Sequence, residues 1–260
     1  MRMVVCVKVT PKAEQVRLDP TTKTLIREGV ESEINPADKN ALEMALNLKD
    51  KHDGEVIVLS MGPPAFEPHL KLAVAMGADD AILLSDRAFA GADTYPTSFT
   101  LAMGIKKLGN VDIIFCGEGS SDAGTNQVPP GIAEWLGIPQ ITFVNKVEVV
   151  DGKVRARRTI RGGYEVVEAP LPVLLSVELG CNTPRFPDFR RKRWAEREFR
   201  LKVWNKNELG VSEEQVGLKA SYTTVKELKE AKMRERKGEF IRGSPEQVTE
   251  KLLEIIKQYL

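Results

Sequence analysis

A run of small and polar residues at positions 117–128 is the part of this sequence best suited to bind a ligand. It reads GEGSSDAGTNQV and is followed by Pro129-Pro130. Small residues let backbone amides approach a phosphate closely, whereas two prolines remove N–H donors that a helix N-terminus usually offers an anion. The pattern predicts either phosphate binding through loop amides and side chains or a flexible loop without a ligand.

The common nucleotide-binding motifs do not match this run. It lacks the Gly-Lys-Ser/Thr ending of a P-loop, and Asp122 stands where a dinucleotide fingerprint would have its third glycine.

A second candidate is Asn35-Pro36-Ala37-Asp38, at the start of a predicted helix. Asn35 can cap that helix, Pro36 suits its first position, and Asp38 suits the positive end of the helix dipole. A capping role is one interpretation. The other is contact with a base or ribose, since the carboxylate of Asp38 would repel a phosphate.

A third candidate is the segment Asn182–Arg200, which begins Asn182-Thr183-Pro184-Arg185. Between Arg185 and Arg200 it holds seven basic and three acidic residues, and Phe186 stands between Arg185 and Pro187. This composition favours protein docking over nucleic-acid readout, and a solvated charge run is the alternative.

The sequence has few of the residues that hydrolytic triads and zinc sites require. The sequence contains only two histidines and three widely spaced cysteines, which argues against Ser-His-Asp triads and Cys/His metal sites. We expect no hydrolytic triad, no metal and buried thiols in a reducing compartment.

The elements that position these residues alternate between strand and helix. Strands are predicted from apolar runs at 3–9, 55–60, 81–84, 111–116 and 141–144, and helices from helical spacing at 36–51, 66–76, 94–108 and 129–136. Such alternation predicts a Rossmann-like, doubly wound α/β sheet that is mostly parallel. The loops after Val9, Ser60 and Cys116 then lie at its ligand-binding edge.

The second half of the chain is different. A hairpin at 147–160 turns at Asp151-Gly152 and begins a β-rich section that continues through 164–168 and 173–177. The basic segment after Arg185 has almost no core-building content, and Thr223–Glu239 is mostly charged, which indicates a partner-dependent or solvated element. A last helix, begun by Ser244-Pro245-Glu246-Gln247, carries one apolar stripe that must pack on its own domain or on a partner.

The net charge and the apolar content of the sequence bear on its expected partners and location. The 260 residues carry a net charge of +1 and are 42% apolar, so we expect no nucleic-acid partner. No apolar run is long enough to span a membrane, and no export signal is evident, so we expect a cytoplasmic protein.

Taken together, five motifs in order resemble the β subunit of electron transfer flavoprotein, and they cover residues 1 to about 200. The motifs are Val7-Lys8 with Pro11, Asn35-Pro36-Ala37-Asp38, Ala75-Met76-Gly77-Ala78-Asp79, the loop from Asp122 to Gln127, and Asn182-x-Pro184-Arg185.

The resemblance implies a Rossmann-like nucleotide-binding domain over 1–200, a C-terminal arm over 201–260 that contacts an α subunit, and docking of redox partner dehydrogenases through Asn182–Arg200. It also implies a nucleotide site, whose residues are Cys6, Asn35, Pro36, Ala37, Asp38, Met61, Gly117, Glu118, Gly119, Ser120, Ser121, Asp122, Ala123, Gly124, Thr125, Asn126, Gln127 and Val128.

The family holds either AMP or, in members that bifurcate the electrons of NADH, a second FAD in this site. Thr125, Gln127, Val128 and Pro130 resemble the bifurcating form, although Pro129 replaces its usual glycine and its Asp run is reduced to Asp122. These residues favour FAD, with AMP as the alternative. Rival classes are an ATP-pyrophosphatase domain, whose Ser-Gly-Gly-x-Asp-Ser loop is absent after the first strand, and a stand-alone adenine-nucleotide-binding domain.

Overall fold

The computed structural model describes residues 1–12, 17–18, 25–26, 31–224, 238 and 240–258. The chain divides into two compact units, Met1–Lys226 and Glu227–Leu260. Each is described by itself below.

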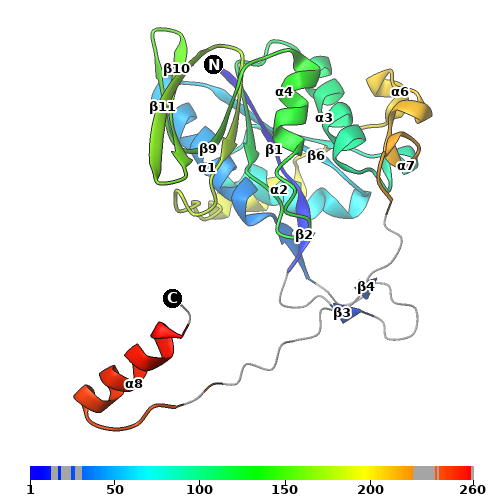
Figure 1. The fold of residues 1–260 in the computed structure, drawn as a ribbon. Coiled ribbons are helices and arrows are strands. Elements are labelled where there is room, and N and C mark those ends of the chain that lie inside the picture. The colour runs from blue at the N-terminus through cyan, green and yellow to red at the C-terminus, as the bar shows by residue number, and fades with distance from the viewer. Residues whose placement is uncertain (13–16, 19–24, 27–30, 225–237, 239, 259–260) are drawn as a thin grey trace. The chain divides into compact units, whose positions relative to one another are not determined.

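A nine-stranded sheet forms the centre of the first unit (Figure 1). Its order is β11-β10-β9-β12-β8-β1-β6-β7-β13, and every pair from β9 to β13 is parallel, whereas β10 and β11 add an antiparallel extension. The strands are β1 (Arg2–Cys6), β6 (Glu55–Met61), β7 (Asp80–Leu84), β8 (Ile113–Gly117), β9 (Gln140–Val150), β10 (Lys153–Ile160), β11 (Gly163–Pro170), β12 (Val173–Val177) and β13 (Lys202–Trp204). The predicted mostly parallel α/β sheet is confirmed.

Two small ribbons accompany the sheet: β2 (Val9–Pro11) pairs with β5 (Ser32–Ile34), and β3 (Arg17–Leu18) pairs with β4 (Leu25–Ile26).

Helices cover both faces of the sheet and create two apolar cores. Met3 and Val5 of β1 point into the core beneath α1 and α2, which we call the first core. Val4 and Cys6 point into the core beneath α3 and α4, which we call the second core. Because strands buried on both faces have no polar side, they read as continuous apolar runs. The helices are α1 (Pro36–His52), α2 (Glu67–Met76), α3 (Thr94–Leu108), α4 (Val128–Leu136), α5 (Phe189–Arg197), and the short α6 (Lys206–Leu209) and α7 (Gly217–Ala220), with 3-10 turns at Pro64–Phe66, Arg87–Phe89 and Glu213–Gln215.

The β-rich section differs from its prediction in one respect. The two short strands expected at 141–144 and 147–150 form one strand, β9, with an irregularity where its pairing to β10 and to β12 shifts register. Phe143 adopts φ 56° there, and its N–H donates to Ser176 Oγ at 3.2 Å. A bulge bends one strand without ending it. The predicted turn at Asp151-Gly152 is confirmed, with φ values of 50° and 72°.

The basic segment contains a helix that we did not predict. Asp188 caps α5 by accepting from the Arg191 N–H at 2.8 Å. The Arg191 guanidinium in turn donates to Val74 O at 3.2 Å and Ala78 O at 2.6 Å. These are carbonyls at the end of α2, where an arginine is favourable. We expected almost no core-building content in this segment, and two of its residues, Ala195 and Phe199, are buried in the first core.

The first compact unit continues past residue 200, where we placed the boundary of the C-terminal arm. β13 pairs with β7 at the edge of the sheet, and Val211 and Val216 are buried in the second core. Most of Thr223–Glu239, the predicted partner-dependent element, lies outside the described residues.

The second compact unit contains α8 (Pro245–Lys257). Ser244 and Gln247 form the predicted capping box, with Pro245 at the first helical position. Leu252, Leu253 and Ile256 are exposed. Within the described residues, no helix combines the length and the apolar character that crossing a bilayer would require.

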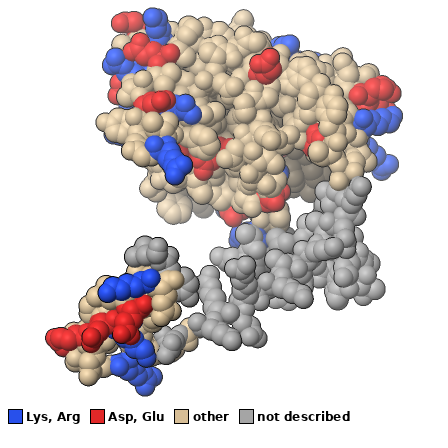
Figure 2. Space-filling model, in the orientation of Figure 1, with Lys and Arg blue, Asp and Glu red and all other residues tan. Residues whose placement is uncertain are grey.

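Charged side chains on the face drawn in Figure 2 lie in small groups of both signs. This matches the near-neutral balance of 38 basic and 37 acidic residues in the sequence.

Candidate functional site

The candidate site lies where the strand order of the sheet reverses. From β1 the chain proceeds through β6 and β7 on one side, then returns to place β8 on the other side. Ligands of open α/β sheets bind beyond the carboxyl ends of the strands at such a switch point. The ends of β1, β6 and β8, at Cys6, Met61 and Gly117, therefore lie at one edge, as the sequence predicted.

Asp38, in the first turn of α1, joins the ends of the two central strands. Its Oδ2 accepts from the Lys8 N–H at 2.7 Å and its Oδ1 accepts from the Gly117 N–H at 3.0 Å. Position 117 must be glycine, because a Cβ there would lie 2.4 Å from Asp38 Oδ1. Burial raises the pKa of Asp38 to about 7, although these backbone bonds favour the charged form. Both carboxylate oxygens are thus occupied by the protein itself.

Asn35 occupies the N-cap position of α1, but its side chain makes no capping hydrogen bond, so the capping interpretation was wrong. Its Nδ2 donates to Gly119 O at 2.9 Å, and its Oδ1 accepts from the Ser121 N–H at 3.1 Å. Asn35 is buried between the helix and the loop. Its side chain fixes the first half of the loop, while Pro36 and Ala37 begin the helix.

The loop 117–128, which we call the glycine-rich loop, has the backbone geometry of an anion-binding concavity. Gly124 and Asn126 have φ values of 61° and 57°, and Gln127 is right-handed at φ −97° and ψ −22°. A left-handed residue next to a right-handed one, as at Asn126 and Gln127, directs successive N–H groups to one side. No acceptor from the described part of the chain bonds the N–H groups of Thr125, Asn126 and Gln127. The residues present therefore fit a nucleotide phosphate.

The rest of the loop supports this geometry. Ser121 Oγ donates to Thr10 Oγ1 at 3.1 Å. A Cβ at position 119 would lie 2.0 Å from Asn126 Oδ1, so Gly119 is needed for Asn126 to fold back against it. Burial raises the pKa of Glu118, helped by the nearby carboxylate of Glu178. The exposed part of the loop runs from Ser121 to Gln127 and includes Ala123.

Lys8 brings a positive charge to the glycine-rich loop, and the sequence-based site omitted it. Its ammonium lies 2.6 Å from Asp122 Oδ1 and 3.3 Å from Ser120 Oγ. The available signal was its place in the first of the five family motifs, Val7-Lys8 with Pro11.

A second omission is the start of α3 and the facing side of α4. Thr94 Oγ1 donates to Gln127 Oε1 at 3.0 Å. Next to this bond is a hollow of about 310 Å³ with Tyr95 and Trp135 in its wall, whose ring centroids are 5.3 Å apart. Nothing in the sequence pattern distinguished Tyr95 and Trp135 from ordinary core aromatics.

The other predicted site residues lie deeper. Cys6 is buried beside Cys116, and the hydrogen bond between the thiols together with burial raises the pKa of Cys116. Met61 is partly buried at the end of β6, against the second core. Val128 starts α4.

The docking segment, Asn182–Arg200, is fastened to α1. Asn40 and Asn182 exchange side-chain and backbone bonds of 2.8 and 3.0 Å, and Asn40 Oδ1 also accepts from the Gly180 N–H at 3.0 Å. Arg185 contacts Glu43 through two nitrogens, at 2.9 and 3.1 Å. Beyond these ties, Phe186 and Phe189 are 93% and 79% exposed.

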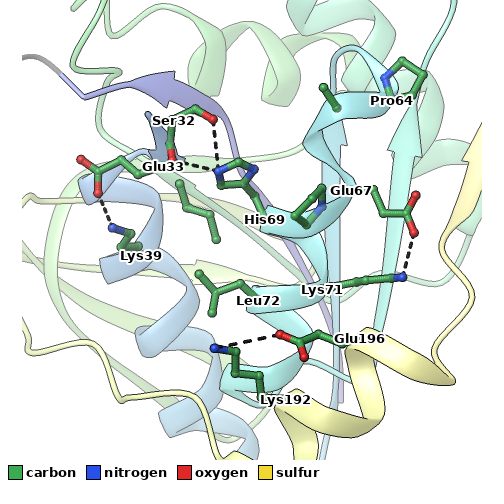
Figure 3. A pocket seen from close by; sticks show the side chains of 13 residues that line it. Ser32, Glu33, Lys39, Pro64, Glu67, His69, Lys71, Leu72, Lys192 and Glu196 are labelled. Carbon is green, nitrogen blue, oxygen red and sulfur yellow. Dashed lines mark hydrogen bonds and ion pairs between the residues drawn. The ribbon is translucent and has the colours of Figure 1, made fainter. Parts of the chain in front are cut away.

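Another hollow, of about 720 Å³, lies between β5, α2 and α5 and contains none of the predicted nucleotide-site residues. Figure 3 shows His69 directed at Ser32, to whose carbonyl its Nε2 lies at 2.9 Å. The charged side chains there pair with one another: Lys39 with Glu33, Lys71 with Glu67, and Lys192 with Glu196. This hollow therefore offers no unpaired charge to a ligand.

Comparison with known proteins agrees with the order of these features. Residues 22–206 match the model of the electron transfer flavoprotein domain. This span holds most of the sheet, the glycine-rich loop and the docking segment.

Individual relatives extend the match over nearly the whole chain. An electron transfer flavoprotein subunit beta of Thermoanaerobacterium thermosaccharolyticum is 45% identical over 254 residues, covering 98% of this chain and 97% of the relative. One from Clostridium acetobutylicum is 50% identical over 226 residues, covering 87% and 86%. Subunit CarD of the caffeyl-CoA reductase-Etf complex of Acetobacterium woodii is 46% identical over 226 residues, covering 86% of each. The chain therefore belongs to the electron transfer flavoprotein family, among its beta subunits.

Proposed function

We propose that this chain pairs with an electron transfer flavoprotein α subunit and holds a nucleotide in its glycine-rich loop. The observation that carries the proposal is the set of unbonded amides at Thr125, Asn126 and Gln127, at the switch point and in the same loop whose Asp122 contacts the ammonium of Lys8. Backbone amides and a lysine are the groups that bind phosphate most commonly. Asp38 and Asn35 serve as braces that hold this loop, since their polar atoms already bond the protein.

The ligand we favour is FAD. Thr125, Gln127, Val128 and Pro130 follow the pattern of family members with a second flavin, and the hollow beside Gln127 offers the rings of Tyr95 and Trp135 to a ring system larger than adenine. A bound flavin would accept a hydride or pass single electrons, and the protein would supply orientation and electrostatics. In that case the complex oxidises NADH and bifurcates its electrons.

The docking segment is the proposed contact for redox partner dehydrogenases. Two exposed phenylalanines on a segment held by Asn40 and Arg185 give a partner a preformed apolar surface. Aromatic and arginine residues are enriched in such interfaces.

The C-terminal arm is the proposed contact for the α subunit. The exposed leucines and Ile256 of α8 form an apolar face. No residue of this helix is buried within the chain itself. A cytoplasmic location belongs to the same proposal and is supported by the three free thiols.

The deciding experiment counts flavin and AMP in the heterodimer made by co-expression with the α subunit. Two flavins and NADH oxidation are expected. The double variant Thr125→Ala/Gln127→Ala should lose the second flavin selectively, and Gly124→Val should strip the nucleotide from a folded chain. One FAD and one AMP would replace the bifurcating assignment with the AMP-binding one, and a heterodimer without nucleotide at this loop would contradict the site.

A separate measurement tests the arm. A chain that lacks residues 240–260 should lose heterodimer formation far more than thermal stability. Stoichiometric recovery of the shortened chain with the α subunit would contradict the proposed contact.

A further inference from the structure

Lys8 has a fixed main chain and a movable charge. Its N–H donates to Asp38 Oδ2 at 2.7 Å, and its carbonyl accepts from the Asn35 N–H at 2.9 Å. These bonds hold its Cα at the carboxyl end of β1. The four-carbon stem of a lysine can nevertheless swing its ammonium between acceptors.

The acceptor that now holds this ammonium is an anion of the loop itself. Asp122 Oδ1 lies 2.6 Å from Lys8 Nζ, and the residues are 114 positions apart in the sequence. Burial alone would raise the pKa of Asp122, but the hydrogen bonds from Lys8 and Ser120 outweigh it and hold the pKa below its usual value. Asp122 is therefore a carboxylate at neutral pH.

The charge balance at this edge is unfavourable for an incoming phosphate while that pair is intact. Among the described residues, Lys8 is the one basic side chain with a hydrogen bond or ion pair to the glycine-rich loop, and its charge is cancelled by Asp122. Glu118 adds a further carboxyl group to the loop. A phosphate can gain the full attraction of Lys8 only if Asp122 gives it up.

We propose that Asp122 occupies the place of the nucleotide phosphate at Lys8, and that binding exchanges one anion for the other. This inference rests on the proposed nucleotide function. The exchange is feasible because the pair is partly exposed, with side-chain accessibilities of 44% for Lys8 and 32% for Asp122, so breaking it costs little. A phosphate offers the ammonium a stronger, charge-assisted bond. Asp122 lies in an exposed turn, from which its side chain can rotate to water.

The exchange predicts effects of opposite sign for two residues that contact each other. Lys8→Met keeps most of the stem and removes the charge that a phosphate needs. Asp122→Asn keeps the shape and removes the competing charge. If Asp122 were instead a ligand of the nucleotide, both substitutions would weaken binding.

The test titrates the nucleotide-depleted heterodimer with AMP and, separately, with FAD. Lys8→Met should raise the Kd of either probe about tenfold, and Asp122→Asn should lower it about three- to tenfold. Glu33→Gln is the matched control, because Glu33 also lies 2.6 Å from a lysine, Lys39, and its side chain lines the other hollow, which contains none of the nucleotide-site residues. It should leave the Kd unchanged.

The possible results distinguish a failure of the proposed exchange from a failure of the proposed nucleotide function. If Asp122→Asn weakens binding, or leaves the Kd of both probes unchanged, the exchange is wrong while the nucleotide site stands. If the wild-type heterodimer binds neither AMP nor FAD, the proposed function itself is wrong.

Discussion

The glycine-rich loop and the docking segment are held by the same helix, yet they present opposite chemistry. Four buried polar residues make these hydrogen bonds. Asn35, directly before α1, and Asp38 bond the loop, whereas Asn40 and Glu43 bond the segment. The loop presents N–H groups and hydroxyls, whereas the segment presents phenylalanine rings. One helix thus positions a small-molecule surface and a protein surface.

These hydrogen bonds differ in the parts of the chain that they connect. Asp38 bonds the backbone at the ends of two sheet strands, so the loop is built into the sheet. Asn40 and Glu43 bond Gly180, Asn182 and Arg185, which follow the last central strand. We therefore expect substitution of Asp38 to destabilise the fold as a whole and substitution of Asn40 to affect only the residues near it.

The largest effect is expected from Asp38→Ala. It leaves the buried N–H groups of Lys8 and Gly117 without an acceptor, and each such loss costs about 1–3 kcal/mol. The free energy of unfolding should fall by roughly 3–5 kcal/mol in total, once the small cavity is included. Urea titration measures it, and nucleotide content should fall too. Asp50→Ala, at an exposed residue of the same helix, is the control, and an equal loss there would refute the difference.

The pH dependence of the free energy of unfolding is a second test of the role of Asp38 in the fold. Asp38 titrates near 7 in the folded chain and near 3.8 when unfolded. The folded state therefore binds the proton more tightly, and this contribution to stability is lost as pH rises through 7. Between pH 5 and pH 8, wild type should lose roughly 2–3 kcal/mol relative to Asp38→Asn, which cannot titrate. Parallel stability curves for the two proteins would count against a raised pKa.

Asn40→Ala should have a smaller and local effect. The Gly180 N–H and Asn182 lose their partners, for about 1–2 kcal/mol. Hydrogen exchange should accelerate at residues 180–188, with nucleotide content unchanged. Asn47→Ala, which removes one 3.3 Å bond to Arg185, is the matched control. Loss of nucleotide from Asn40→Ala would mean that the two surfaces are not held independently.

The smallest effect on stability is expected from Phe186→Ser. A side chain that is 93% exposed contributes little, so the free energy of unfolding should change by less than about 0.5 kcal/mol. The rate of electron exchange with a partner dehydrogenase should nevertheless fall at low partner concentration. Phe240→Ser, at an exposed aromatic of the other unit, serves as control. An unchanged rate for Phe186→Ser would remove the docking role.

The sequence predicted the regular elements better than the ties between them. β-Branched runs and helical spacing are local signals, so the central strands and α1 to α4 fall close to their predicted ranges. α5 was missed because it depends on the bonds of Arg191 to the end of α2, which are tertiary. Asn35 was taken for a cap because only the folded chain brings Gly119 and Ser121 to it. The contact between Lys8 and Asp122 was not predicted either, because only the folded chain brings these two residues together.

The position of β13 has a consequence for the order in which the molecule is made. β7 is complete at Leu84, but its outer neighbour comes from Lys202–Trp204, which also accepts the Ser85 N–H at Trp204 O. On the ribosome, the N–H and C=O groups on that side of β7 stay open while more than a hundred further residues are synthesised. Open strand edges pair with other chains. The nascent protein is therefore most prone to self-association in this interval, and three residues near the end of the first unit close it.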